Sequence, residues 1–218
     1  MSKALLTPVL RAELKQLYDA PGRPKYTLSH RDSLLEFLAE HRSAFNDPDA
    51  IEAVIWFHDA IHDPRAMDNE QKSAQLCAAR LASVADRARV QRIIDMILAA
   101  GSNTLPKYPS KKHVKDAELF LDIDLHIFGA SREKYLEYED AMREEYAWAG
   151  EDAWVVGHGS SIRKFLDMPH VYRTKVMRDK YEKQAQENLR FSLDRLTELT
   201  AKLADKTNKA DKADGESK

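Results

Sequence analysis

Apolar residues recur at intervals of three or four positions through most of the 218-residue chain. That spacing gathers them on one face of an α-helix and leaves polar residues on the other. It predicts helices at 5–17, 29–41, 49–62, 70–84, 86–100, 116–128, 131–148 and 178–203, with a short helix after residue 161. No run alternates with the period of two that is typical of strands. The pattern therefore predicts an all-α fold.

Turn-forming residues separate the predicted helices. Residues 21–25 (PGRPK) end the first helix, and Ser29 is placed to cap the second. Residues 46–49 (NDPD) combine a turn with a helix start, and 157–161 (GHGSS) are predicted to form a turn. We also expect a polar loop at 63–70 (DPRAMDNE).

The length of the chain favours one domain with extensions, which we place at 1–203. Residues 204–218 have no large apolar side chain and mix Lys with Asp and Glu. Such a segment buries too little apolar surface to offset its ordering entropy. We therefore predict that 204–218 form a disordered charged tail.

Composition narrows the class of protein further. The net charge of −2 provides no excess of Lys and Arg for nucleic acid or an anionic membrane. Cys77 is the only cysteine, so an intrachain disulfide is impossible, and we expect its side chain to be buried in a helix. The N-terminal residues are amphipathic rather than a signal peptide, and no stretch approaches the roughly 20 apolar residues that span a bilayer. We expect a cytoplasmic protein without a membrane span.

An adjacent pair of polar side chains, His58 and Asp59, interrupts the otherwise apolar predicted helix at 49–62. Burying an imidazole and a carboxylate there is costly unless a partner compensates them. A divalent metal would do so, because imidazole nitrogen and carboxylate oxygen are both metal ligands. The alternative is a histidine that caps a neighbouring helix beside an aspartate in a salt bridge. On the dipeptide alone, both interpretations stay open.

Two further residues extend this pattern. His30 lies near the start of one predicted helix, and Asp124 lies in another apolar helix that also carries Asp122. Histidine, the His-Asp pair and aspartate therefore follow one another along the chain, each on its own helix. This order resembles that of the HD superfamily of metal-dependent phosphohydrolases.

The resemblance extends to one branch of predicted HD phosphohydrolases, over about residues 20–190. That branch has the patterns R-x-Y-H-N-x-x-H, W-F-H-D-A-x-Y-D-P, N-E-x-x-S-A, D-x-D-L-x-I-L-G, R-x-E-Y and A-x-x-N-L. The corresponding segments here are RPKYTLSH (23–30), WFHDAIHDP (56–64), NEQKSA (69–74), DIDLHIFG (122–129), REEY (143–146) and AQENL (185–189). The resemblance implies an HD-domain helical bundle with a central metal site.

The resemblance implies one divalent metal ion, Mn, Mg, Co, Ni, Fe or Zn, bound by four residues. These expected ligands are His30, His58, Asp59 and Asp124. Asp122 is expected behind a ligand or at the surface. The candidate catalytic residues are Asp59, Glu70 and His62. Glu70 would orient a ligand or act as a general base, unless it only complements a helix N-terminus.

A phosphorylated substrate needs positive charge around its phosphate. The candidates for this role are Arg23, Lys25, Lys111 and Arg143. Lys111 belongs to the basic segment 107–113, which alternatively is a solvated loop. Arg143 alternatively forms a salt bridge on a charged helix.

The chain departs from the family pattern at three positions. Tyr26 stands where relatives have histidine in the first motif, and Asn103 stands where a Thr-x-x-His histidine is expected. His62 replaces the tyrosine of the HDAxYD motif and, four residues after His58, would share its helical face. It would replace a lost ligand or hydrogen-bond a carboxylate.

The resemblance implies hydrolysis of a small phosphate ester, with a nucleotide as one option. One alternative is a catalytically weak or inactive HD domain that binds a nucleotide or a protein partner. The other is an HD-type di-iron oxygenase, which the substitutions at Tyr26 and Asn103 disfavour because a second metal needs further ligands. A homodimer formed through the long helices at 131–148 and 178–203 stays open.

Overall fold

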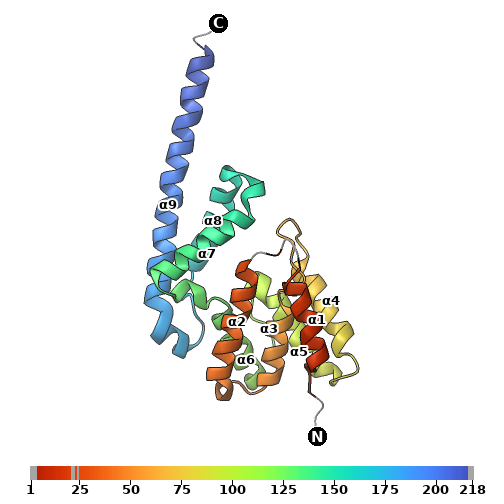
Figure 1. Ribbon diagram of the computed structural model, residues 1–218. Helices are drawn as coiled ribbons and strands as arrows, with labels where there is room; N and C mark the ends of the chain where they lie inside the picture. The colour runs from red at the N-terminus through yellow and green to blue at the C-terminus, as the bar shows by residue number, and fades with distance from the viewer. Residues whose placement is uncertain (1–3, 21–22, 24, 216–218) are drawn as a thin grey trace. The chain divides into compact units, whose positions relative to one another are not determined.

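The computed structural model describes the backbone of residues 4–20, 23 and 25–215, and the side chains of 4–20, 23 and 28–204 (Figure 1). Every regular element in these residues is a helix, which confirms the predicted all-α fold. The chain divides into two compact units, Met1–Leu125 and His126–Lys218, and each is described by itself. No described helix is both long and apolar enough to cross a membrane.

The elements of the two units follow one another along the chain. The first unit contains α1 (Pro8–Tyr18), α2 (Lys25–Glu40), the 3₁₀ helix η1 (Arg42–Ala44), α3 (Pro48–Phe57), α4 (Asn69–Leu81), α5 (Arg87–Ser102) and α6 (Lys111–Asp124). The second contains η2 (His126–Gly129), α7 (Arg132–Glu145), η3 (Ala147–Ala149), α8 (Glu151–Leu166) and α9 (Lys175–Gly215). The segment predicted as a disordered tail, 204–218, begins within α9, since the backbone of 204–215 continues this helix, and its side chains after residue 204 lie outside the described residues.

Helix α3 forms the core of the first unit. Seven of its ten residues are buried, and it contacts α1, α2, α4 and α5. Because apolar side chains surround it on all sides, the whole helix reads as apolar rather than amphipathic. Cys77 of α4 is buried in the same unit, as predicted, and burial raises the pKa of its thiol to about 12.

Two carboxylates, the partly exposed Asp47 and the buried Asp116, fix the start of α3. Asp47 caps the helix by accepting from the Ala50 backbone N–H at 3.2 Å, and it accepts from the Arg89 guanidinium at 2.8 and 2.5 Å. Asp116 of α6 accepts from the backbone N–H groups of Asn46 and Asp47 at 2.8 and 2.9 Å. Burial alone would raise the pKa of Asp47, but the Arg89 contact and the cap more than offset this and lower it.

The Asp116 anchor also sets the direction of α6 relative to α3. Asp116 meets the start of α3, and eight residues later Asp124 lies 3.6 Å from His58, which follows the last residue of α3. The two helices therefore run side by side in the same direction. As a result, their C-terminal ends meet.

Replacing Asp116 by alanine is expected to destabilise the protein by about 2–4 kcal/mol, because it leaves the buried N–H groups before α3 without an acceptor. Thermal unfolding followed by circular dichroism measures the loss. Asp116→Asn keeps one acceptor oxygen and should lose less. Equal stability of Asp116→Ala and the unmodified protein would show that this anchor contributes nothing.

Helix α3 ends earlier than the sequence predicted. The spacing predicts a helix over 49–62, but α3 ends at Phe57 and residues 59–61 form a turn. The Ser73 hydroxyl accepts from the Ile61 N–H at 3.1 Å, and the Asn69 amide pairs with the Asp63 backbone at 3.0 and 2.8 Å. These contacts from α4 hold the turn in place of helical hydrogen bonds. The expectation that His62 shares a helical face with His58 is therefore wrong.

Helix α9 packs against both η2 and α8 in the second unit. Asn188, fully buried, donates to the backbone carbonyls of Phe128 and Ala130 at 2.8 and 2.9 Å and so fastens η2. The turn predicted at 157–161 is wrong, because these residues lie within α8. Gly159 is buried there, and a Cβ built on it would lie 3.7 Å from Leu196 of α9. Packing against α9 thus outweighs the low helix propensity of glycine.

Candidate metal centre

Three potential metal ligands from three elements converge in the first unit. They are His30 of α2, His58 at the end of α3 and Asp124 at the end of α6. One ligand atom from each lies within 4.8 Å of the other two. Two imidazoles and a carboxylate form a donor set that suits divalent transition metals. The geometry therefore brings together three of the four predicted ligands in one group.

The orientation of the His58 ring suits a metal ligand. Its Nδ1 lies 3.0 Å from the Ile55 carbonyl oxygen, which only accepts, so Nδ1 carries the proton and donates. This assigns the lone pair to Nε2, which is buried and makes no hydrogen bond within the described part of the chain. A backbone carbonyl that fixes the tautomer in this way is a common support for metal-bound histidine. The ring edge of Phe120, on α6, lies beside it at a centroid distance of 6.2 Å.

The Asp124 carboxylate connects the two imidazoles. Its Oδ1 lies 3.1 Å from His30 Nε2 and 3.6 Å from His58 Nε2. Burial by itself lowers the pKa of His30, but the hydrogen bond and charge of Asp124, with the charge of Asp59, more than offset this and raise it. A proton on His30 is therefore stabilised at the place where a metal would otherwise supply positive charge.

Asp59 reaches the group from the turn after α3. Its Oδ2 lies 3.3 Å from His58 Nε2, and its side chain is 29% exposed, against 3% for that of His58. Asp59 therefore lies on the open side of the centre. Arg23 donates to the Asp59 backbone carbonyl at 2.5 Å and stacks over the buried Tyr18 ring at 4.9 Å. Arg23 thus fixes the backbone that presents this carboxylate.

The other predicted catalytic residues lie on the elements that flank the turn. Glu70 belongs to the first turn of α4, and a Cβ built on Gly101 of α5 would lie 2.5 Å from its carboxyl carbon. The Glu70 side chain therefore lies against the α5 backbone at Gly101, and a side chain at residue 101 would require the Glu70 carboxylate to move. His62 is half-buried in the turn itself. Asp122 is fully buried, so it is not at the surface.

Of the predicted phosphate-binding residues in the first unit, Arg23 lies against the centre and Lys111 does not. Lys111 begins α6 and Asp124 ends it, so thirteen steps of about 1.5 Å place the two residues about 20 Å apart, beyond the reach of a lysine side chain. Arg143 belongs to the second unit, where it pairs with Glu151 at 2.7 Å. The side chain of Lys25 lies outside the described residues.

Of the two positions where the family pattern has a histidine and this chain does not, the structure describes the side chain of Asn103 but not that of Tyr26. Asn103 follows α5 in the left-handed region, with φ 50° and ψ 38°, and is the one non-glycine residue with positive φ in the part of the chain described. Asparagine tolerates this conformation better than most residues, which accounts for its place at the helix end. The side chain of Tyr26 lies outside the described residues.

Two supporting residues were not predicted from the sequence. Phe120 contacts His58, and Ile55 orients it through a backbone carbonyl. Phe120 lies four residues before Asp124, hence on the same face of α6, and this spacing is a signal that the sequence already contains. No sequence signal marks a backbone carbonyl.

The chain matches no protein-family model, and no curated protein or solved structure matches it either. The site is therefore defined by its own geometry: a buried pair of histidines with an aspartate between them, in an all-helical protein.

Proposed function

We propose that this protein is a metal-dependent phosphohydrolase of the HD type that acts on a small phosphate ester. One observation carries the proposal: His30, within α2, converges with His58 and Asp124 at the ends of α3 and α6, and the buried lone pair of His58 Nε2 is directed into the group. Asp59 beside His58 supplies the second carboxylate of an HD ligand set. The ordered motif resemblance over about residues 20–190 supports the same family.

Each residue of the centre has a distinct role in the proposed reaction. When bound, the metal would polarise a phosphoryl oxygen and lower the pKa of a coordinated water. His30 and His58 contribute neutral nitrogens, and Asp59 and Asp124 contribute two negative charges. Arg23 holds the turn that carries Asp59. Because Asp59 is the more exposed carboxylate, it faces the side from which a substrate and water approach.

The experiment combines metal analysis with an activity screen. The purified protein is expected to bind one divalent ion per chain, since Asp59 and Asp124 offer too little negative charge for two adjacent dications. Hydrolysis of p-nitrophenyl phosphate and nucleoside monophosphates is then measured with Mn²⁺, Mg²⁺, Co²⁺, Ni²⁺, Fe²⁺ or Zn²⁺, and with a chelator. A stoichiometry near two, or a spectroscopic iron pair, would contradict the single-metal proposal and favour oxygen activation.

A second candidate function is binding without efficient catalysis. It is favoured by Asn103, which ends a helix in the left-handed conformation where the family resemblance implies a histidine. In that case the protein would bind metal and a nucleoside monophosphate in calorimetry but release no phosphate in the screen. Metal-dependent phosphate release that is lost on chelation would exclude this alternative.

A further inference from the structure

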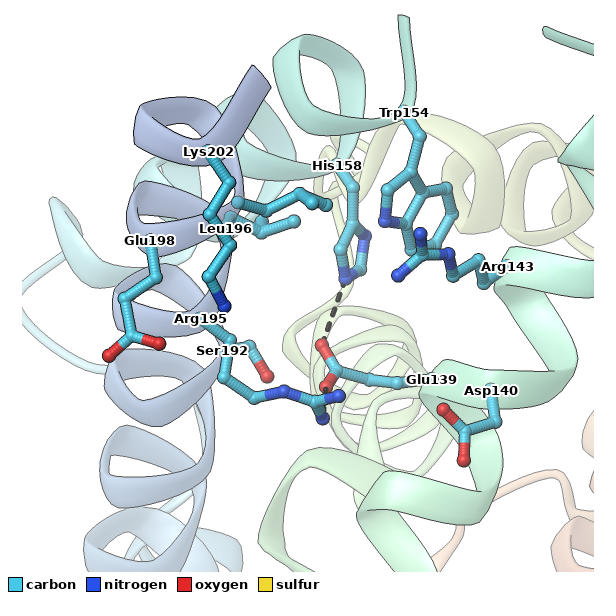
Figure 2. Close-up of a pocket in the computed structure, with 11 residues that line it drawn as sticks. Glu139, Asp140, Arg143, Trp154, His158, Ser192, Arg195, Leu196, Glu198 and Lys202 are labelled. Carbon is cyan, nitrogen blue, oxygen red and sulfur yellow. Dashed lines mark hydrogen bonds and ion pairs between the residues drawn. The ribbon is translucent and has the colours of Figure 1, made fainter. Parts of the chain in front are cut away.

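The second unit contains a cavity of about 200 Å³ between α7, α8 and α9 (Figure 2). Its lining residues are Glu139, Asp140, Arg143, Trp154, His158, Ser192, Arg195, Leu196, Glu198, Leu199 and Lys202. All of them belong to 126–218, and none is part of the proposed metal centre. The lining is rich in ionisable side chains, and apart from Arg143, a candidate phosphate-binding residue, the resemblance to HD proteins leaves them without a role.

The floor of the cavity is a buried carboxylate whose charge is already compensated. Glu139 is 8% exposed, accepts from His158 Nε2 at 3.0 Å and from the Tyr135 hydroxyl at 3.3 Å, and lies 3.8 Å from Arg195. Burial alone would raise the pKa of Glu139, but the hydrogen bond and charge of His158 and the charge of Arg195 more than offset this and lower it. Glu139 therefore serves as a fixed internal counter-ion.

The cavity wall keeps its shape through aromatic packing. Trp154 stacks on His158 with centroids 4.3 Å apart and an interplanar angle of 20°. Since His158 is also held by Glu139, its ring is fixed from two sides. A ligand would therefore meet a largely preformed wall, which lowers the ordering cost of binding.

Cationic side chains surround the opening. Figure 2 shows the Arg143 guanidinium and the Lys202 ammonium directed toward the cavity, with the Glu198 carboxylate on the outer side of α9. The Arg143 pair with Glu151 is half-exposed, and such pairs contribute little, so a ligand can compete for this guanidinium. Lys202 has no ion pair among the described side chains. Asp140 and Glu198 are the acidic residues of the lining that oppose an anion, since the charge of Glu139 is compensated by His158 and Arg195.

We propose that this cavity binds a small, multiply charged anion of the polyphosphate or polycarboxylate type through Arg143, Arg195 and Lys202. The planar guanidinium group of arginine can donate two parallel hydrogen bonds to the oxygens of a phosphate or carboxylate, and the lysine ammonium adds a compact positive charge. The size of the cavity agrees with a small anion, because drug-sized ligands occupy roughly 300–1,000 Å³.

Calorimetric titration of the full chain with pyrophosphate, in the presence of a chelator, tests this proposal. Lys202→Met is expected to weaken binding about tenfold, since it removes a charged contact to the anion. Lys183→Met is the matched control, because Lys183 lies on the same helix, is 92% exposed and is no part of the cavity; it should bind as the unmodified protein does. Asp140→Asn should tighten binding, because it removes an opposing charge.

The outcomes separate this site from the metal centre. Asp124→Asn should bind pyrophosphate with unchanged affinity under chelation, so failure of the phosphohydrolase proposal would leave this result intact. A parallel titration with citrate distinguishes the two anion types: equal binding indicates recognition of charge, and weaker binding indicates recognition of phosphate. Absence of pyrophosphate binding at millimolar concentration, or equal affinity in Lys202→Met, would overturn the proposal.

Discussion

Asp124→Asn is expected to abolish tight metal binding and to lower phosphate release by at least about 100-fold, because ligand support and charge are lost together. Asp124 Oδ1 contacts both imidazoles, at 3.1 and 3.6 Å. An amide keeps the shape of the side chain but removes the negative charge that offsets a dication. The substitution therefore separates the electrostatic role of Asp124 from its packing.

Metal content after dialysis, together with the rate of phosphate release, measures this effect. Glu118→Gln is the matched control, since it makes the same change on the same helix outside the ligand group and should keep both metal and activity. Asp59→Ala is also expected to abolish metal binding, because the centre then retains one carboxylate. Full occupancy in Asp59→Ala would reduce the ligand set to His30, His58 and Asp124.

Metal affinity is expected to fall about tenfold for each pH unit below the pKa of His30, because a proton and the metal compete for the same nitrogen. Burial lowers the pKa of His30, but the contacts with Asp124 and Asp59 outweigh it and raise the pKa above its ordinary value. The loss of affinity should thus begin at a higher pH than for an ordinary histidine. Titration with Co²⁺ or Zn²⁺ at several pH values measures it.

The metal-free protein should show the opposite trend in stability. A raised pKa in the folded state means that protonated His30 stabilises the fold fully below the pKa of the unfolded chain, about 6.5. This contribution is lost as the pH rises through the raised pKa of the folded state. Thermal unfolding under chelation measures it, and His30→Gln should remove the pH dependence in that range. An unchanged pH profile in His30→Gln would show that another group is responsible.

Local patterns in the sequence were sufficient for the type of fold. The three- to four-residue spacing of apolar side chains predicted helices, and the described residues form only helices as regular elements. The resemblance to HD proteins singled out His30, His58 and Asp124 as expected ligands, whereas polar side chains in apolar helices by themselves left a metal and a salt bridge both open. In the structure these three lie together. Such features depend on residues near one another in the chain.

Helix ends proved harder to predict, because distant residues decide them. Nothing local distinguishes Phe57 from Ile61 as the end of α3; the Ser73 hydroxyl and the Asn69 amide of α4 do. In the same way, 157–161 form a helix because α8, which contains them, packs against α9. Both cases show long-range packing and hydrogen bonding outweighing local propensity.

The relations between elements required the tertiary structure. Lys111 and Asp124 lie on one helix, but its length separates them by about 20 Å. The cavity around His158 and Glu139 joins residues 19 positions apart with others from α9. The sequence by itself determined the helical class of the fold and suggested which residues carry chemistry. Only the tertiary structure decided which of them meet, because that depends on where helices end and how their faces pack.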